Sequence, residues 1–258
     1  NSVLTKLSNG KEDAFHSKWL ATIVFDAPVD KDPKSYLTGK TDENDVSELL
    51  TELEMYKLLE KLKNIYLKIC AEQKPDGVAC AFDLRAPTFR HKADSSYKAN
   101  RHGMPDELAQ QMPMIKRLLK GVGVHVLETE GFEADDILGT LSAACAQNGD
   151  ECVILTGDRD SLQLINDKVT VLLHGTKETT VFTPEKFHEV YGLEPKQLID
   201  LKGLMGDSSD NISGVKGIGE KTALTLIGEY GSVENLYEKL ENNEVKATNS
   251  VLTKLSNG

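Results

Sequence analysis

Helix-like segments and short apolar runs alternate along the chain from about residue 64, and this alternation limits the fold more than any other feature. The apolar runs cover residues 77–83, 124–128, 151–158 and 169–173. Helical patterns precede the first three of these runs. Strands that alternate with helices are typical of an α/β fold with a mostly parallel sheet. Residues 184–240 are predicted to be mainly helical.

Ten residues, NSVLTKLSNG, occur twice, as residues 1–10 and as residues 249–258. Chance does not repeat ten residues in an otherwise non-repetitive chain. Three explanations are open: a circular DNA assembly read past its own start, a circular permutation, and a genuine terminal repeat. Read as a circle, Gly258 continues into Lys11, so that residues 1–63 follow the rest of the chain.

The organisation of the chain follows from changes in composition. Residues 27–48 are rich in Pro, Asp and Lys, which favours an exposed linker, and a helical pattern with apolar residues every three or four positions follows it. We expect this region to be peripheral. The predicted parts are a displaced segment, an α/β core, a helical subdomain and the duplicate, at residues 1–63, 64–183, 184–248 and 249–258.

Acidic side chains collect where the predicted strands end and the next helices begin. They are Asp83, Glu133, Asp135, Asp136, Asp158 and Asp160. Any one of them could favour a helix start or form a turn. In an open α/β sheet, however, ligands bind beyond the carboxyl ends of the strands, where so many carboxylates would repel one another unless cations bind. Their hard oxygen atoms favour magnesium or manganese over zinc.

A glycine-rich turn lies in residues 203–231. Gly214, Gly217 and Gly219 precede a predicted helix, so that backbone N–H groups and a helix N-terminus form a phosphate site. Such contacts position a duplex by its backbone without reading its sequence. The turn alone would also fit a plain helix–helix connection, but Asp207 and Asp210 beside it favour the phosphate site.

A basic segment with aromatic side chains extends from Arg85 to His102. Its members are Arg85, Phe89, Arg90, His91, Lys92, Tyr97, Lys98, Arg101 and His102. Positive charge and aromatic rings together suit a nucleic-acid single strand, whose bases stack while its phosphates are neutralised. The alternative is a solvated loop.

The formal net charge of −11 argues at first against a nucleic-acid partner. Bound metal ions would offset acidic residues locally, so the total charge is compatible with a metal-using nuclease. The four cysteines form no C-x-x-C pair and are predicted to be reduced and buried, neither binding zinc nor forming disulfides. The chain has no apolar run of about 18 residues and no signal-like start, so we expect a cytoplasmic protein without a membrane span.

Five motifs resemble, in order and over roughly residues 64–240, the 5′-nuclease domain of bacterial DNA polymerase I. They are AFDLRAPTFRH, YKANR, EGFEADDILGTL, ILTGDRDSLQLI and LMGDSSDNISGVKGIGEKTA. The family has a PIN-like α/β core with a helix-hairpin-helix subdomain and is related to flap endonucleases. The resemblance implies a metal-dependent 5′-3′ exonuclease or 5′-flap endonuclease that acts on flap, nicked or branched DNA in replication and repair. It also implies polymerase domains in the full-length protein.

The resemblance also implies roles for individual residues. The metal-site carboxylates would be Asp83, Glu133, Asp135, Asp136, Asp158, Asp160, Asp207 and Asp210, binding two or more Mg²⁺ or Mn²⁺ ions. Lys98 and Arg101 resemble basic residues at the scissile phosphate and, with Asp83, Glu133, Asp135 and Asp136, form the predicted catalytic set. The predicted DNA-binding residues are Arg85, Arg90, Tyr97, Lys98, Arg101, Gly214, Val215, Lys216, Gly217, Ile218, Gly219, Lys221 and Thr222. In the family the hairpin also holds a monovalent cation such as K⁺, and Ser213 replaces a common proline.

The order of segments departs from the family. Residues 11–23 resemble the segment that follows the nuclease core, and residues 49–62 resemble the start of the next polymerase domain. The family opens with a strand that carries an Asp-Gly-Asn type motif, and this sequence has no such motif. The junction near Lys63 and Asn64 is therefore expected to remove the central strand, one metal ligand and the following helix.

Two other functions are compatible with the sequence. A chain without its first strand could retain duplex binding and lose hydrolysis; it would then bind without magnesium and leave the DNA intact. A metal-dependent phosphatase that acts on small substrates is the third possibility. The glycine-rich hairpin argues against a phosphatase. Competition by duplex DNA would distinguish the phosphatase from a nuclease that acts on DNA.

Overall fold

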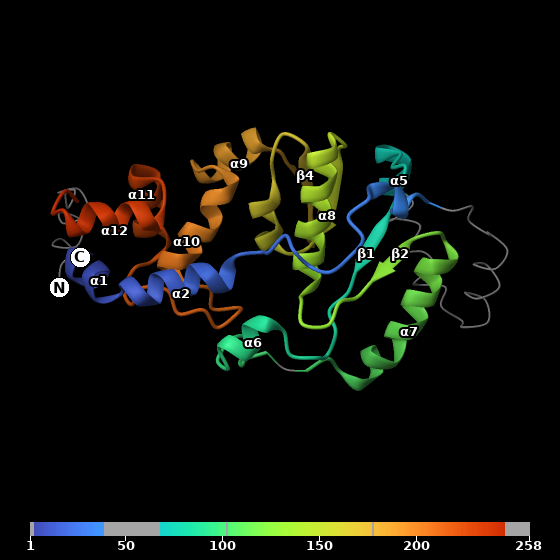
Figure 1. Ribbon diagram of the computed structural model, residues 1–258, viewed down its shortest axis with the longest axis horizontal. Coiled ribbons are helices and arrows are strands. Elements are labelled where there is room, and N and C mark those ends of the chain that lie inside the picture. The colour runs from blue at the N-terminus through green and yellow to red at the C-terminus, as the bar shows by residue number, and fades with distance from the viewer. Residues whose placement is uncertain (1–2, 39–67, 102, 177, 246–258) are drawn as a thin grey trace.

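The computed structural model describes residues 3–38, 68–101, 103–176 and 178–245. Strands and helices alternate through the middle of the chain, and most of the remaining helices gather at one end of the molecule (Figure 1). This arrangement confirms the predicted α/β class.

The strands form two small sheets in the described part of the chain. They are β1 (Ala79–Ala81), β2 (His125–Leu127), β3 (Cys152–Thr156), β4 (Val169–His174) and β5 (Thr179–Phe182). β1 pairs with β2 and β3 pairs with β4, both in parallel, while β5 joins β4 antiparallel. The sequence predicts a central sheet that lacks one strand. In the structure β1 and β3 are edge strands of separate sheets.

Helix α8 (Ala134–Asn148) joins these two sheets, because it packs against both β1 and β3. Its Gly139 lies against residues 23–25, where an added Cβ atom would be 2.6 Å from Ile23 Cγ2. The helix ends at Gly149, whose φ of 84° is in the left-handed region that favours glycine. α8 therefore fixes the first sheet, the second sheet and the N-terminal segment relative to one another.

The other helices cover the sheets or build the helical end. They are α1 (Val3–Asn9), α2 (Lys11–Ala21), α5 (Lys68–Gln73), α6 (Phe89–Ala93), α7 (Asp106–Gly121), α9 (Pro184–Tyr191), α10 (Leu198–Met205), α11 (Glu220–Tyr230) and α12 (Val233–Glu241). Short 3₁₀ helices cover Pro33–Tyr36, Arg159–Leu164 and Pro195–Gln197. The mainly helical character predicted for residues 184–240 is confirmed.

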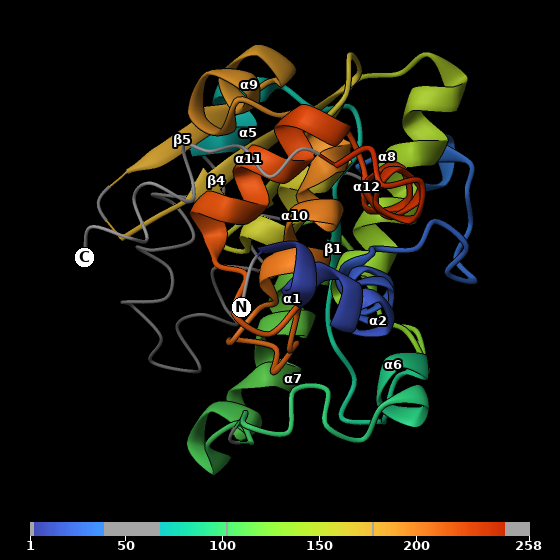
Figure 2. The same ribbon diagram turned by 90° about the vertical axis from the view of Figure 1, so that its left-hand side faces the viewer.

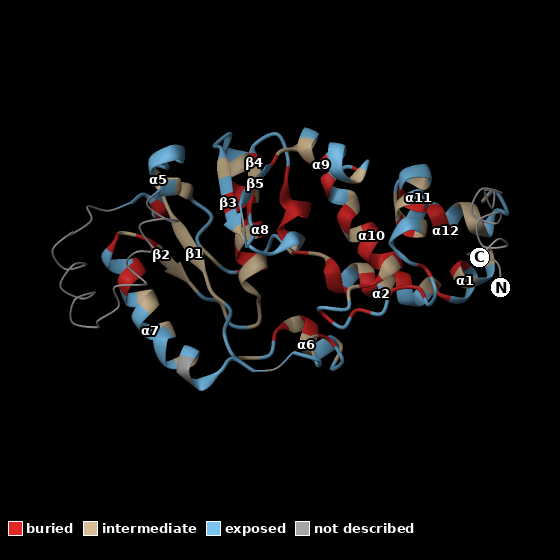
Figure 3. Ribbon diagram, turned by 180° about the vertical axis from the view of Figure 1, so that it is seen from behind, coloured by how far each residue is buried: buried red, intermediate tan, exposed pale blue. Residues whose placement is uncertain are grey.

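The largest apolar core lies between the second sheet and the helical end (Figure 3). Leu201 and Leu204 of α10, Ile227 of α11 and Leu236 of α12 are all almost completely buried in it. α2 packs tightly against α10, where an added Cβ atom at Gly203 would lie 2.9 Å from Lys18 Cβ. The two helices lie side by side in both views (Figure 1, Figure 2).

Part of the predicted linker, residues 27–48, packs against the protein. Ala27 is completely buried and its N–H donates to Thr140 Oγ1 at 3.1 Å, and Tyr36 is also buried. The expectation of an exposed linker is therefore wrong for these positions. Residues 39–67, which include the helical pattern after the linker, lie outside the described residues.

The four cysteines are free thiols, as predicted, but each is half-buried instead of buried. They lie in α5, β1, α8 and β3. Among the described residues, no helix has the length and apolar character needed to cross a membrane.

Candidate active site

The predicted carboxylates meet where β1 and β3 end and α8 begins. Asp83 follows β1, Asp158 follows β3, and Glu133 immediately precedes α8. Asp83 Oδ1 accepts a hydrogen bond from Ala134 N at 2.7 Å, which links the end of β1 to the first turn of α8. Negative charge at a helix N-terminus is favourable because of the helix dipole. The strand ends and the helix start thus explain why the carboxylates are neighbours.

Asp135 carries the strongest sign of crowded negative charge. Burial raises the pKa of its carboxyl group to about 7, and the carboxylates of Asp158, Asp160 and Asp83 add to this rise. The nearby Lys98 opposes the shift only in part. Asp135 Oδ1 accepts a hydrogen bond from Ser161 Oγ at 3.3 Å. Bound cations would relieve this repulsion.

Lys202 lies between two of the predicted carboxylates. This buried lysine of α10 contacts Asp160 Oδ1 through its Nζ atom, and the same atom lies 2.5 Å from Asp207 Oδ2. Burial alone would raise the pKa of Asp207, but hydrogen bonds from Lys202 and Ser209 hold it at about 2. Lys202 is not among the predicted site residues, because the only sign of its role in the sequence is a charged residue among the apolar positions of α10.

Lys98 and Arg101 surround the predicted ligands Glu133 and Asp210. Lys98 Nζ lies 2.8 Å from Glu133 Oε1 and 3.6 Å from Asp210 Oδ2. Arg101 also pairs with Asp210. Lys98 has a φ of 54°, a left-handed conformation that is uncommon for a residue with a side chain and that concentrates at functional sites. Two cations and two carboxylates therefore alternate along this side of the site. They lie beside the group of carboxylates that we call the Asp135 cluster, which consists of Asp83, Asp135, Asp158 and Asp160.

Asp136 and Arg90 form a buried ion pair with each other. The predicted roles were different: a metal ligand for Asp136 and a DNA contact for Arg90. Arg90 NH1 and NH2 each lie 2.8 Å from an oxygen of Asp136, and Asp136 is completely buried. Asp136 Oδ1 also accepts from Val24 N at 3.0 Å, and Arg90 donates to the carbonyl oxygens of Leu20 and Thr22. Because these groups satisfy each other, the structure leaves Asp136 no oxygen for a metal ion and Arg90 no donor for DNA.

The rest of the basic segment divides between the surface and the interior. Arg85 is exposed, whereas Tyr97 is buried and its hydroxyl group donates to Glu133 Oε2 at 3.0 Å. A buried ring cannot stack on a nucleobase, so the structure corrects the prediction for Tyr97. His102 lies outside the described residues.

The glycine-rich hairpin combines buried apolar residues with an exposed edge. Gly214 and Gly217 have φ values of 61° and 83°, and an added Cβ atom at Gly214 would lie 2.2 Å from Gly206 N. Val215 and Ile218 are buried and anchor the hairpin. The exposed edge consists of Lys216, Gly217, Gly219 and Lys221, and the partly buried Thr222 follows on α11. Gly219 is the N-cap of α11, so basic side chains lie beside a helix N-terminus.

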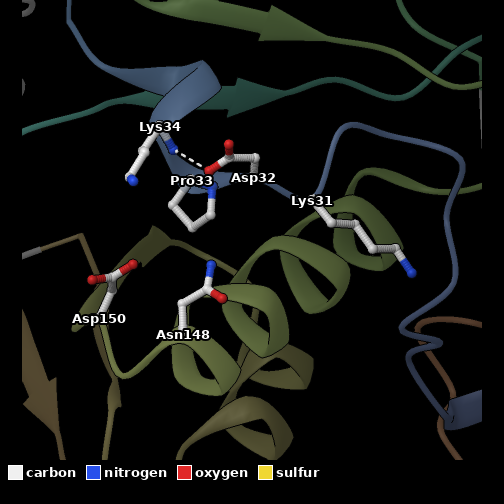
Figure 4. Close-up of a pocket in the computed structure, with 6 residues that line it drawn as sticks. All are labelled: Lys31, Asp32, Pro33, Lys34, Asn148 and Asp150. Atoms are coloured by element: carbon white, nitrogen blue, oxygen red, sulfur yellow. Dashed lines mark hydrogen bonds between the residues drawn. The ribbon is translucent and has the colours of Figure 1, made fainter.

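A pocket lies at the opposite end of α8 from the carboxylates. It has a volume of about 620 Å³ and is lined by Lys31, Asp32, Pro33, Lys34, Asn148 and Asp150 (Figure 4). Asn148 ends α8, and Asp150 precedes β3. This pocket contains none of the predicted site residues, so the pocket and the cluster of carboxylates are at different places in the molecule.

The partners of the carboxylates decide which of them could bind a metal ion. Among the described residues, no three His, Cys, Asp or Glu side chains converge closely enough to hold a metal ion. Lysine or arginine groups contact four of the predicted ligands, which are Glu133, Asp160, Asp207 and Asp210. Asp83, Asp135 and Asp158 form no ion pair with a lysine or arginine in the described part of the chain, and their hard oxygens fit a divalent cation.

Comparison with known proteins gives the family. Residues 52–192 match the 5′-3′ exonuclease N-terminal resolvase-like domain, and residues 193–258 match the 5′-3′ exonuclease C-terminal SAM fold. DNA polymerase I of Bacillus caldotenax is 47% identical over 176 residues, which are 67% of this chain and 20% of that protein. The thermostable DNA polymerase I of Thermus filiformis is 49% identical over 170 residues, covering 65% and 20%. The chain thus spans about a fifth of the length of these curated relatives.

Solved structures share the fold at low sequence identity. T5 5′-exonuclease with bound zinc has a TM-score of 0.57 and 21% identity, covering 78% of this chain and 83% of that chain. The T5 D15 protein co-crystallised with metal ions has a TM-score of 0.58 and 20% identity, covering 77% and 82%. The domain matches, which cover residues 52–258, show that the chain belongs to the 5′-3′ exonuclease family.

Proposed function

We propose that this chain hydrolyses phosphodiester bonds of DNA at or near a 5′ end, as a divalent-metal-dependent 5′-3′ exonuclease or 5′-flap endonuclease. The observation that carries the proposal is the Asp135 cluster. A partly buried group of carboxylates at the carboxyl ends of two strands lies beside basic side chains that can receive a phosphate. In the full-length protein, polymerase domains would accompany this activity, as the names of the relatives indicate.

Asp83, Asp135 and Asp158 would hold the first divalent cation, because none of them is neutralised by a lysine or arginine among the described residues. Since they do not converge into a metal-binding group in the structure, binding the ion would have to draw these carboxylates together. Their hard oxygen ligands favour Mg²⁺ or Mn²⁺. When bound, such an ion polarises the phosphoryl group and lowers the pKa of a coordinated water. Asp160 and Asp207 would contribute to a second site where Lys202 now neutralises them.

Lys98 and Arg101 would bind the phosphate that is cut. Their present partners, Glu133 and Asp210, keep them at the edge of the carboxylate cluster. Positive groups held in place at a site of developing negative charge stabilise the transition state without reorganisation. Lys98 is largely buried and has a constrained backbone, so it is the better placed of the two.

The hairpin would bind duplex DNA through its backbone phosphates. Lys216 and Lys221 lie on the exposed edge beside the N-terminus of α11, where N–H groups and the helix dipole favour an anion. This contact reads no sequence, which suits an enzyme that selects DNA by its shape. A K⁺ ion at the hairpin is part of the same proposal, and duplex affinity in K⁺ compared with Li⁺ would test it.

The decisive experiment is cleavage of a 5′-labelled flap duplex with and without Mg²⁺. We expect magnesium-dependent product from the unmodified chain and none from Asp158→Ala. Asp167→Ala is the matched control, since Asp167 is an exposed aspartate on the loop between β3 and β4. Product that forms equally well in Asp158→Ala would reject the assigned cluster. The size of the released product separates exonuclease from flap cleavage.

A binding-only function is the second candidate, and a specific observation favours it. The described strands form two separate sheets, and the carboxylates do not converge into a metal-binding group. Such a chain would retain duplex binding through the hairpin without Mg²⁺. Intact flap substrate in the presence of Mg²⁺, together with magnesium-independent duplex binding, would select this function over hydrolysis.

A further inference from the structure

The duplicated sequence NSVLTKLSNG has a defined binding place in the structure. Its first copy forms α1, in which Leu7 is completely buried in the main apolar core. Lys6 Nζ donates to Gly217 O at 3.0 Å, and an added Cβ atom at Gly10 would lie 2.6 Å from Val215 Cγ1. The copy therefore fits a groove on the hairpin that we call the α1 groove, lined by Val215, Gly217 and the core around Leu7.

The described part of the chain ends at the same end of the molecule as this groove. The described chain ends at Val245, which packs against the same apolar core that buries Leu7. Glu241, in the last turn of α12, pairs with Lys11 at the start of α2, and α12 lies at the same end of the molecule as α1 (Figure 1). Three residues separate Val245 from Asn249, and they can span about 10 Å when extended.

We propose that the α1 groove accepts residues 249–258 of the same chain as an alternative to residues 1–10. Identical side chains offer identical contacts, so Leu255 takes the place of Leu7 and Lys254 takes the place of Lys6. Only the connection differs. Gly10 continues into α2 and its carbonyl oxygen accepts from Ala14 N at 2.9 Å, whereas Gly258 is not followed by Lys11 in the sequence and so does not lead into α2. The first copy is therefore preferred, and the second copy replaces it when its docking is weakened.

Three variants of the whole chain test this exchange: Leu7→Ala, Leu255→Ala and the double variant. Loss of a fully buried leucine weakens docking by at least about 30-fold, so in Leu7→Ala the second copy occupies the groove. Both single variants should then melt within about 2 °C of the parent. The double variant should melt at least about 5 °C lower. A Leu7→Ala variant that melts as low as the double variant would overturn the proposal.

Leucine-methyl NMR provides a second measurement that does not depend on stability. In the parent, the Leu7 methyl signals should be shifted by the buried environment, and those of Leu255 should resemble an exposed leucine. In Leu7→Ala, the Leu255 signals should move to the positions that Leu7 occupied. The shift should be independent of protein concentration, because the occupant belongs to the same chain. A shift that grows with concentration and accompanies a dimer would instead assign the groove to a second copy of the protein, and unchanged Leu255 signals would also reject the exchange.

Discussion

Arg90 and Asp136 form a buried ion pair in which each nitrogen of the guanidinium end, NH1 and NH2, lies 2.8 Å from a carboxylate oxygen. The pair joins α6 to α8, and Arg90 also donates to the carbonyl oxygens of Leu20 and Thr22. Removing one member would leave the other charge buried without compensation. The pair should therefore contribute strongly to the free energy of unfolding.

We expect Arg90→Met to lower the free energy of unfolding by about 3–5 kcal/mol, because it leaves the Asp136 carboxylate unpaired in the interior. The double variant Arg90→Met/Asp136→Leu should recover most of this loss, since neither charge remains. Urea unfolding measures all three proteins. If the free energy of unfolding of Arg90→Met lies within about 1 kcal/mol of the parent value, the ion pair does not hold α6 against α8.

Asp207 predicts a loss of stability in acid. Its folded-state pKa of about 2 is below the unfolded value of about 3.9. A depressed acid pKa contributes stability above the unfolded value, and this contribution is lost as the pH falls from about 4 to about 2. The shift corresponds to about 2–3 kcal/mol.

The check for Asp207 is urea unfolding between pH 2.5 and 6. Asp207→Asn should flatten the decrease in stability over this range, while Asp167→Asn, an exposed aspartate, should leave it unchanged. If the free energy of unfolding changes with pH equally in Asp207→Asn and in the parent, Lys202 and Ser209 do not lower the pKa of Asp207.

Asp135 predicts the opposite pH dependence. Its folded-state pKa of about 7 lies above the unfolded value, so the metal-free protein loses stability as the pH rises from about 4 through 7. Asp135→Asn should therefore stabilise the metal-free protein at pH 8, by up to about 4 kcal/mol. It should also remove the increase in melting temperature that Mg²⁺ gives the parent by binding the folded state.

The measurement for Asp135 is thermal unfolding at pH 8 in EDTA and in Mg²⁺. Asp150→Asn is the control, because Asp150 is exposed at the far end of the sheet. If the parent melts at the same temperature with and without Mg²⁺, Asp135 does not belong to a metal site.

The hairpin predicts a change in DNA binding without a loss of chemistry. Lys216→Ala/Lys221→Ala should weaken duplex binding, and the slope of log affinity against log salt should fall by about 2, one unit for each lost phosphate contact. Single-turnover cleavage at saturating enzyme should change little. Lys239→Ala offers a surface-lysine control on α12. An unchanged slope would mean that DNA does not contact this edge.

Local spacing determined much of this protein from the sequence alone. Glu133 and Asp136 are three residues apart, and they lie at the N-cap and in the first turn of α8, while Asp83 and Asp158 follow apolar runs that become β1 and β3. Gly214, Gly217 and Gly219 similarly predicted the hairpin before α11. Helical and strand periods act over a few residues, so such patterns are readable without knowing the tertiary contacts.

The tertiary structure decided which charges neutralise each other. Arg90 and Asp136 are 46 positions apart, and Lys202 and Asp160 are 42 positions apart, so no local period brings them together. The tertiary structure also placed Leu7, Ala14 and Ile23 of the N-terminal segment in the main core, far along the chain from the residues that they contact. Whether a carboxylate is free for a cation depends on the distant lysine or arginine that the fold brings to it. Once the carboxylate and its lysine or arginine are buried, they must pair, because an unpaired charge away from water raises the free energy of the folded protein.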